Sequence, residues 1–284
     1  MLETVVRPHG PYSMRLSART GEVTVALPGP EAGHAWQRSD GVVVLRAASE
    51  AGLERLRFVL ALDADHTQFL RRFARDPLLG PSTRALQGLR PLRTATVAHA
   101  LLKAVAGQLI EARRAHAIVR AILRACSAEV PGTQLREPPS AGALGRLAPA
   151  ELSRLGLSAQ RAATLVRLCR GLDPERLHDF PTATVRARLE RERGMGPWSS
   201  GIVVLEGLGR YDHGLVGDLG LIKLCSSLHG RWVEPWETAE LLEPYGEWQG
   251  LAGVYLMAGW KRGLVPGASA DGWRPARARA HHAA

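Results

Sequence analysis

The feature that most constrains this sequence is a short connection between two predicted helices that contains two glycines and a proline. The segment is Gly194-Met195-Gly196-Pro197-Trp198-Ser199. Glycine is typical of the end of a helix, whereas proline is typical of the first turn of the next one. The first N–H groups of that second helix have no partner within it, so they can hold a phosphate without a charged side chain. The pattern indicates a helix-hairpin-helix, which grips one DNA strand regardless of sequence, although an ordinary corner between two helices has the same glycine spacing.

The charge balance favours the same kind of partner. The formal net charge is +10, which favours a polyanion such as nucleic acid. A generally basic proteome would give the same balance, so charge alone does not decide. Only three of the 37 basic residues are lysines, namely Lys103, Lys223 and Lys261. This scarcity limits the amine chemistry that is open to the chain.

Composition and periodicity predict an α+β protein with a small β-rich domain followed by an all-α region. Hydrophobic residues make up 45% of the chain and charged residues 23%, which is typical of a globular protein. We expect an α+β domain over residues 1–62, a helical region over 63–264 and a disordered tail over 265–284. Strands are predicted over 12–18, 22–27 and 41–46, and a helix over 50–57. Further helices are predicted over 63–75, 94–124 (as one or two), 148–170 (as two broken at Gly156), 181–193, 198–208, 219–228 and 237–260.

An aspartate begins the second helix after the glycine-rich connection. Asp218 lies twenty residues after Trp198, in the segment Gly217-Asp218-Leu219-Gly220. Aspartate is among the preferred N-cap residues, so a purely structural role is sufficient to explain it. A helix N-terminus also favours a negative charge, so the same residue suits an anion or a base better than a general acid. The two roles are compatible.

A hairpin, a helix and then an aspartate at a helix start, in this order and spacing, resemble the HhH-GPD superfamily of DNA glycosylases. The resemblance covers roughly residues 60–262 and includes three further segments in family order. These segments are Gly88–Pro91, Ala106–Leu109 and Leu155–Ser158. Within the superfamily the chain looks most like the alkylation-repair branch, 3-methyladenine DNA glycosylase II, which also has a small β-rich domain before its helices.

The resemblance implies roles for individual residues. It makes Asp218 the catalytic residue and Leu109 the candidate for the wedge that fills the gap left by a flipped base, with a core leucine as the alternative reading. The remaining residues that it implies in DNA binding are Gly194, Met195, Gly196, Trp198, Ser199 and Gln108. The base pocket that it implies is formed by Trp198, Ile202, Leu219 and Met257, with Tyr12 reaching in from the N-terminal domain.

Several departures from the family pattern narrow the reaction. Bifunctional members carry a Schiff-base lysine two residues after the second hairpin glycine, and here that position is Trp198. Lys223 follows Asp218 by five residues, so we expect it to point elsewhere. Four closely spaced cysteines, which the iron–sulfur members need, are absent from the sequence. The resemblance therefore implies a monofunctional enzyme that uses water as the nucleophile, with no cofactor and no metal.

The pocket residues bear on the substrate. Well-known members stack several aromatic side chains on electron-poor bases, whereas this chain has aliphatic residues at Ile202 and Leu219 and a methionine at Met257. Reduced stacking predicts reliance on bases whose glycosidic bond is already weak, since stacking contributes roughly 1–3 kcal/mol per base. Such bases are 3-methyladenine and 7-methylguanine, which carry a positive charge.

Together these observations predict a monofunctional DNA N-glycosylase of base excision repair that excises alkylated purines and leaves an abasic site. Two alternatives stay open: a non-catalytic protein that binds damaged DNA, and a glycosylase for deaminated purines such as hypoxanthine. The expected partner is double-stranded DNA containing alkylated bases, with no obligate protein partner. No apolar run approaches the roughly 18 residues of a membrane span, and we expect a cytoplasmic, bacterial-type, nucleoid-associated protein.

Overall fold

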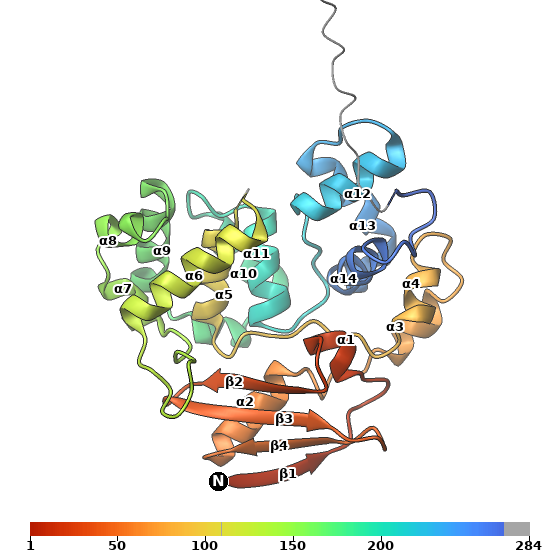
Figure 1. The fold of residues 1–284 in the computed structure, drawn as a ribbon. Helices are drawn as coiled ribbons and strands as arrows, with labels where there is room; N and C mark the ends of the chain where they lie inside the picture. The colour runs from red at the N-terminus through yellow and green to blue at the C-terminus, as the bar shows by residue number, and fades with distance from the viewer. Residues whose placement is uncertain (109, 270–284) are drawn as a thin grey trace, which may run out of the picture.

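The computed structural model describes residues 1–108 and 110–269, and it has an α+β fold in which one small sheet lies beside two groups of helices (Figure 1). The sheet has the strand order β1-β4-β3-β2, and all of its neighbouring strands are antiparallel. Its strands are β1 (Leu2–Val6), β2 (Glu22–Leu27), β3 (Glu31–Gln37) and β4 (Val43–Ala47). Helix α2 (Glu50–Val59) packs on the sheet, as predicted for residues 50–57.

The prediction for residues 12–18 is wrong, because this segment forms helix α1 (Met14–Ala18) in place of a strand. The Ser13 side chain caps the helix by accepting a hydrogen bond from the Leu16 amide, and Gln37 Oε1 accepts one from the Met14 amide at 2.8 Å. The side chain of Met14 is fully buried. Capping and burial of one residue thus outweigh the β-like apolar pattern.

Two strands were not predicted from the sequence. Strand β3 contains Ala32, Gly33 and Ala35, which have low strand propensity, but it pairs with β2 on one side and β4 on the other. Strand β1 lies at the edge of the sheet and pairs with β4 only. These two strands therefore form because they pair with other strands of the sheet, and local strand propensity does not indicate them.

The helices form two groups, each with its own hydrophobic core (Figure 1). The first group contains α5 (Val97–Gly107), α6 (Ala112–Cys126), α7 (Ala141–Arg146), α8 (Pro149–Arg154), α9 (Ala159–Gly171), η1 (Pro174–Asp179), α10 (Thr182–Glu190), α11 (Pro197–Ile202) and the π-helical turn η2 (Val203–Gly207). The second contains α3 (Thr67–Arg72), α4 (Gly80–Ala85), α12 (Leu219–His229), η3 (Pro235–Glu237), α13 (Thr238–Leu242), η4 (Glu243–Trp248) and α14 (Gln249–Trp260). Of the one or two helices predicted over residues 94–124, the structure has two, and residues 148–170 form two helices that are separated at Gly156, as predicted.

Some predicted boundaries shift in the structure. Helix α3 begins at Thr67, where the Asp65 carboxylate accepts a hydrogen bond from the amide of Thr67 at 2.8 Å. At the other end, the packed chain extends beyond residue 264: Trp260 Nε1 donates to the carbonyl of Ser269 at 2.8 Å, and Val265 is buried. Residues 270–284, for which we predicted disorder, lie outside the described residues. No helix in the described part of the chain is long and apolar enough to cross a membrane.

Candidate active site

A cavity of about 1230 Å³ lies where the two helical groups meet. Its wall comes from α5, α6, α9 and α11–η2 of the first group and from α12 and α14 of the second. The cavity brings together the α10–α11 turn, which we define as residues Arg191–Gly196, and Asp218 at the start of α12. Two motifs that the sequence analysis identified separately therefore open into one space.

Asp218 is held at the N-terminus of α12 by three N–H donors. Its Oδ1 accepts hydrogen bonds from the amides of Gly220 at 2.8 Å and Leu221 at 3.2 Å, so the residue is the N-cap, as predicted. Its Oδ2 accepts a hydrogen bond from the indole Nε1 of Trp198 at 2.9 Å. An ionised carboxylate offers about four lone-pair sites, so one acceptor site remains, on Oδ2, for a group inside the cavity.

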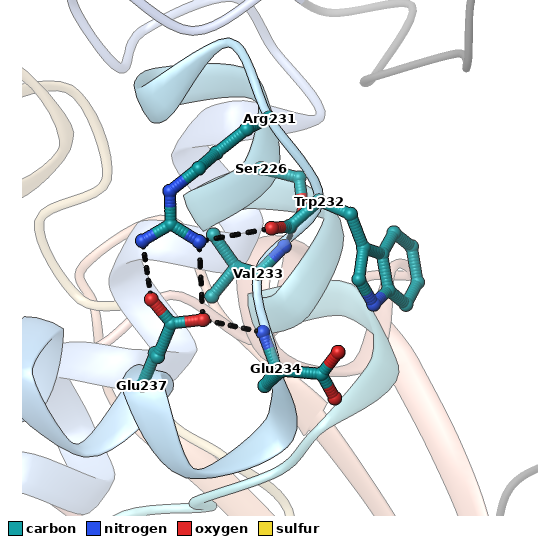
Figure 2. Close-up of polar contacts among 6 residues, drawn as sticks. All are labelled: Ser226, Arg231, Trp232, Val233, Glu234 and Glu237. Carbon is teal, nitrogen blue, oxygen red and sulfur yellow. Dashed lines mark hydrogen bonds and ion pairs between the residues drawn. The ribbon is translucent and has the colours of Figure 1, made fainter.

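The backbone before Asp218 is braced by the connection between α12 and α13. The amide of Gly217 donates to Oγ1 of Thr238 at 2.8 Å, and the Thr238 side chain is fully buried. Figure 2 shows how that connection is held: Arg231 bonds to the Glu237 carboxylate, and Glu237 accepts the amide of Glu234 at 2.7 Å. The contact with Arg231 lowers the pKa of Glu237 to about 2. The backbone is thus held before Asp218 through Gly217, and the carboxylate is bonded to amides that follow it.

Trp198 lies across the end of α5. A Cβ on Gly107 would come within 2.7 Å of Cη2 of the Trp198 indole, so the absence of a side chain at Gly107 makes room for the ring. The ring then presents its Nε1 to Asp218. The main visible role of Trp198 is therefore to orient the carboxylate, which sequence reasoning did not anticipate.

The α10–α11 turn is tight and partly open. Gly194 has a φ of +94°, in the left-handed region that favours glycine. Gly196 has an extended backbone, and a Cβ there would meet nothing within 4 Å. The side chain of Met195, whose contact with DNA stays a prediction, is buried in the core of the first helical group, and its amide donates to the carbonyl of Glu192 at 2.9 Å. Among the described residues, no hydrogen bond is found for the backbone N–H groups of Gly194 and Gly196, whereas that of Met195 is bonded.

Gln108 connects α5 to this turn. Its Nε2 donates to the carbonyl of Gly194 at 2.6 Å and to Oγ of Ser199 at 2.9 Å, and its own carbonyl accepts from Arg161. The side chain of Ser199 is itself buried. Both residues, which we predicted to bind DNA, therefore brace the turn through their side chains. Leu109, the predicted wedge, lies outside the described residues.

The predicted base pocket is assembled with one exception. Ile202, Leu219 and Met257 line the cavity beside Trp198. Tyr12 does not: its ring lies under the guanidinium of Arg90, 5.0 Å from it, and burial raises the pKa of its hydroxyl to about 12. Tyr12, two residues before α1, packs against the hydrophobic core of the N-terminal domain instead.

All three lysines of the chain line this cavity. The expectation that Lys223 points elsewhere is wrong, because the helical spacing places it on the cavity side of α12 with Leu219. Lys103 of α5 forms an ion pair and hydrogen bond with Glu206 of η2. Sequence reasoning missed this pair, although the scarcity of lysine was a signal. Among the described residues, no group of three potential metal ligands is found.

Comparisons with known proteins agree with the motifs. The chain is 28% identical over 204 residues to a DNA-3-methyladenine glycosylase of Bacillus subtilis (strain 168). The matched segment covers 69% of this chain and 67% of that protein. The structure of this chain is similar to that of the 3-methyladenine DNA-glycosylase from Archaeoglobus fulgidus, with a TM-score of 0.76 and 19% identity. The match covers 92% of this chain and 98% of that one. A comparison with protein-family profiles finds no match.

A second solved structure shares the fold and contains DNA. It is the Clostridium acetobutylicum 8-oxoguanine glycosylase/lyase in complex with double-stranded DNA that has cytosine opposite 8-oxoguanine. The TM-score is 0.70 at 16% identity, and the match covers 92% of this chain and 99% of that one. The resemblance to HhH-GPD DNA glycosylases that the sequence motifs indicated is thus confirmed.

Proposed function

We propose that this protein is a monofunctional DNA N-glycosylase that removes alkylated purines from double-stranded DNA. The observation that carries the proposal is the position of Asp218, whose carboxylate opens into a cavity shared with the α10–α11 turn. The relative from Bacillus subtilis and the shared fold support the reaction class. We infer the substrate range from the pocket, which offers Ile202, Leu219 and Met257 where aromatic residues would strengthen stacking.

The α10–α11 turn supplies the grip on DNA in this proposal. As a helix-hairpin-helix, it holds one phosphate with the amides of Gly194 and Gly196 and with the N-terminus of α11. The close support from Gln108 keeps those amides in place. A target base cannot react inside the duplex, so it rotates out of the stack and enters the cavity.

Asp218 then acts on the sugar. The bond between C1′ and the base nitrogen breaks, and its electron pair leaves with the alkylated base, which thereby loses its positive charge. The carboxylate stabilises the positive charge that develops at C1′. Water adds to C1′ and gives a proton to the free acceptor site of Asp218, which leaves an abasic site. Two amides and one indole N–H donate to the carboxylate and hold it in place for both tasks.

The residue at the amine position of the family pattern supports the proposed absence of lyase chemistry. Trp198 stands two residues after Gly196, and its ring nitrogen is already bonded to Asp218. The amine of Lys103 is engaged in an ion pair with Glu206. We therefore propose that water alone resolves the sugar cation.

The test is the release of free bases from methylated double-stranded DNA, measured by chromatography. The proposal predicts release of 3-methyladenine or 7-methylguanine together with abasic sites in intact strands. A non-catalytic protein would retain the DNA and release no base. A glycosylase for deaminated purines would release hypoxanthine from inosine-containing DNA in preference to methylated bases.

A further inference from the structure

The wall of the cavity contains one charged pair whose position the reaction does not explain. Helix α5 carries a single lysine, arginine, aspartate or glutamate, which is Lys103, and the segment α11–η2 likewise carries only Glu206. The two side chains bond to each other, and both line the cavity. They are 32% and 21% exposed, so both remain accessible from the cavity.

Helical spacing places the pair on the same wall as Trp198, farther from the α10–α11 turn. Trp198, Ile202 and Glu206 follow one another at intervals of four residues, so they lie on one face of the α11–η2 segment. Since α11 begins at the turn, Glu206 lies about 12 Å further along the helix than Trp198. The facing helix has the matching order, because Gly107 contacts Trp198 and Lys103 contacts Glu206. The wall therefore runs from the indole at Asp218, past Ile202, to the ion pair.

The pair has unused hydrogen-bonding capacity. A lysine ammonium has three N–H donors and one is bonded to Oε2 of Glu206. Among the described residues, no other hydrogen bond is found for that ammonium or for Oε1 of Glu206. The pair therefore presents donors and acceptors side by side on the cavity wall.

We propose that Lys103 and Glu206 recognise the Watson–Crick edge of the flipped base and select guanine-derived bases over adenine-derived ones. A guanine edge presents the O6 acceptor beside the N1–H and N2–H donors. The ammonium donates to O6, and the two carboxylate oxygens accept the adjacent N–H groups. Flipped bases are commonly recognised along this edge. An adenine edge has an amino donor in place of O6 and an acceptor N1 in place of N1–H. The ammonium would then face a donor and the carboxylate would face an acceptor, so neither could form its hydrogen bond.

This inference rests on the proposed function and narrows its substrate to 7-methylguanine and related bases. One DNA preparation tests it, because duplex DNA treated with dimethyl sulfate carries both 7-methylguanine and 3-methyladenine. The readout is the ratio of the two released bases, after subtraction of spontaneous release without enzyme. Wild-type protein should show a ratio that favours 7-methylguanine relative to the content of the DNA.

Two variants of the pair separate recognition from stability. Glu206→Gln should lower 7-methylguanine release at least about tenfold relative to 3-methyladenine release, because an amide N–H₂ then opposes N1–H or N2–H. The exchange variant Lys103→Glu with Glu206→Lys keeps the ion pair but reverses its order, so it should shift the ratio toward 3-methyladenine. Thermal unfolding establishes that each variant is folded. The matched control is Glu129→Gln, which breaks an ion pair with Arg136 that lies outside the cavity and should leave the ratio unchanged.

The outcomes distinguish this inference from the proposed function. If Glu206→Gln and the exchange variant both release the two bases in the wild-type ratio, the pair does not recognise the base edge and the inference is overturned. A wild-type ratio that favours 3-methyladenine would overturn it as well. Failure of the wild-type protein to release either base would instead overturn the proposed function, and the inference with it.

Discussion

The indole Nε1 of Trp198 donates a 2.9 Å hydrogen bond to Oδ2 of Asp218 and thereby ties the helix after the glycine-rich turn to the helix that begins at the carboxylate. The two residues lie on different helical groups. The bond occupies one of the two lone pairs of Oδ2 and fixes the direction of the other. In the proposed reaction, Trp198 is a positioning residue for Asp218.

Replacement of Trp198 by Phe should lower the rate of base release about tenfold to hundredfold. The change keeps an aromatic ring against Gly107 but removes the N–H donor, and hydrogen bonds to charged groups contribute about 1.5–3 kcal/mol. Single-turnover base release measures the effect, and binding to abasic-analogue DNA should change little. The matched control is Trp248→Phe, because Nε1 of Trp248 is buried and has no partner among the described residues. Equal losses of rate in both variants would contradict a positioning role.

Gly107→Ala should reduce base release by displacing the indole of Trp198. The added Cβ would lie 2.7 Å from Cη2 of the ring, so the ring must move away from its position beside Asp218. Gly171→Ala is the control, because it also changes the last residue of a helix, and a Cβ there meets nothing within 4 Å. Comparison of release rates and melting temperatures checks the prediction. Wild-type activity in Gly107→Ala would show that the ring position is unimportant.

Gly196→Val should weaken DNA binding while leaving the fold intact. The backbone at Gly196 is extended and its Cβ position is open, so the side chain fits the free protein but obstructs an approaching strand. Because the proposed contact of the turn is with phosphate, affinity should fall to a similar extent for different duplex sequences. Fluorescence anisotropy with several duplexes measures this, with Arg193→Ala as a comparison that should lose less affinity. Undiminished binding by Gly196→Val would identify the turn as an ordinary corner.

Treatment with borohydride during the reaction should trap no covalent complex between the protein and DNA. Lyases form a Schiff base between an amine and C1′, and Trp198 stands at the amine position of the family pattern. The test is demanding, because Lys103, Lys223 and Lys261 all line the cavity. If a trapped complex does form, its loss in a Lys→Met variant of one of these three residues would identify the amine and overturn the monofunctional assignment.

Local signals account for much that was predicted correctly. The capping of α12 by Asp218 and the ends of the helices around the turn depend on residues close together in sequence, so glycine, proline and aspartate patterns were sufficient. The confirmed similarity to DNA glycosylases rests on the same motifs. The failures lie where distant residues decide: α1 is fixed by Gln37, and β3 is fixed by strands on both sides.

Contacts between residues distant in sequence also explain what was missed in the cavity. Lys103 and Glu206 are 103 residues apart, and nothing near either residue indicates the other. The hydrogen bonds of Gln108 likewise reach across to Gly194 and Ser199, a bracing role that no local sequence signal indicates. Tyr12 was expected to reach the pocket from the N-terminal domain, but it packs under Arg90, 78 residues away in sequence.

The most direct test of the proposed function is base release by Asp218→Asn. Asparagine caps a helix about as well as aspartate, so the variant should fold and melt like the wild type. It lacks the negative charge that faces the sugar cation, and the loss of one well-placed electrostatic group costs about 10²–10³ in rate. Binding to abasic-analogue DNA should hold or strengthen, because a negative charge near phosphates is removed.

The decisive measurement is the single-turnover rate of release of methylated purines from dimethyl-sulfate-treated duplex DNA by folded Asp218→Asn protein, beside the wild type. The account predicts a rate at least about 100-fold below wild type, with DNA binding retained. Release at a near wild-type rate would contradict the assignment of Asp218 and, with it, the proposed mechanism.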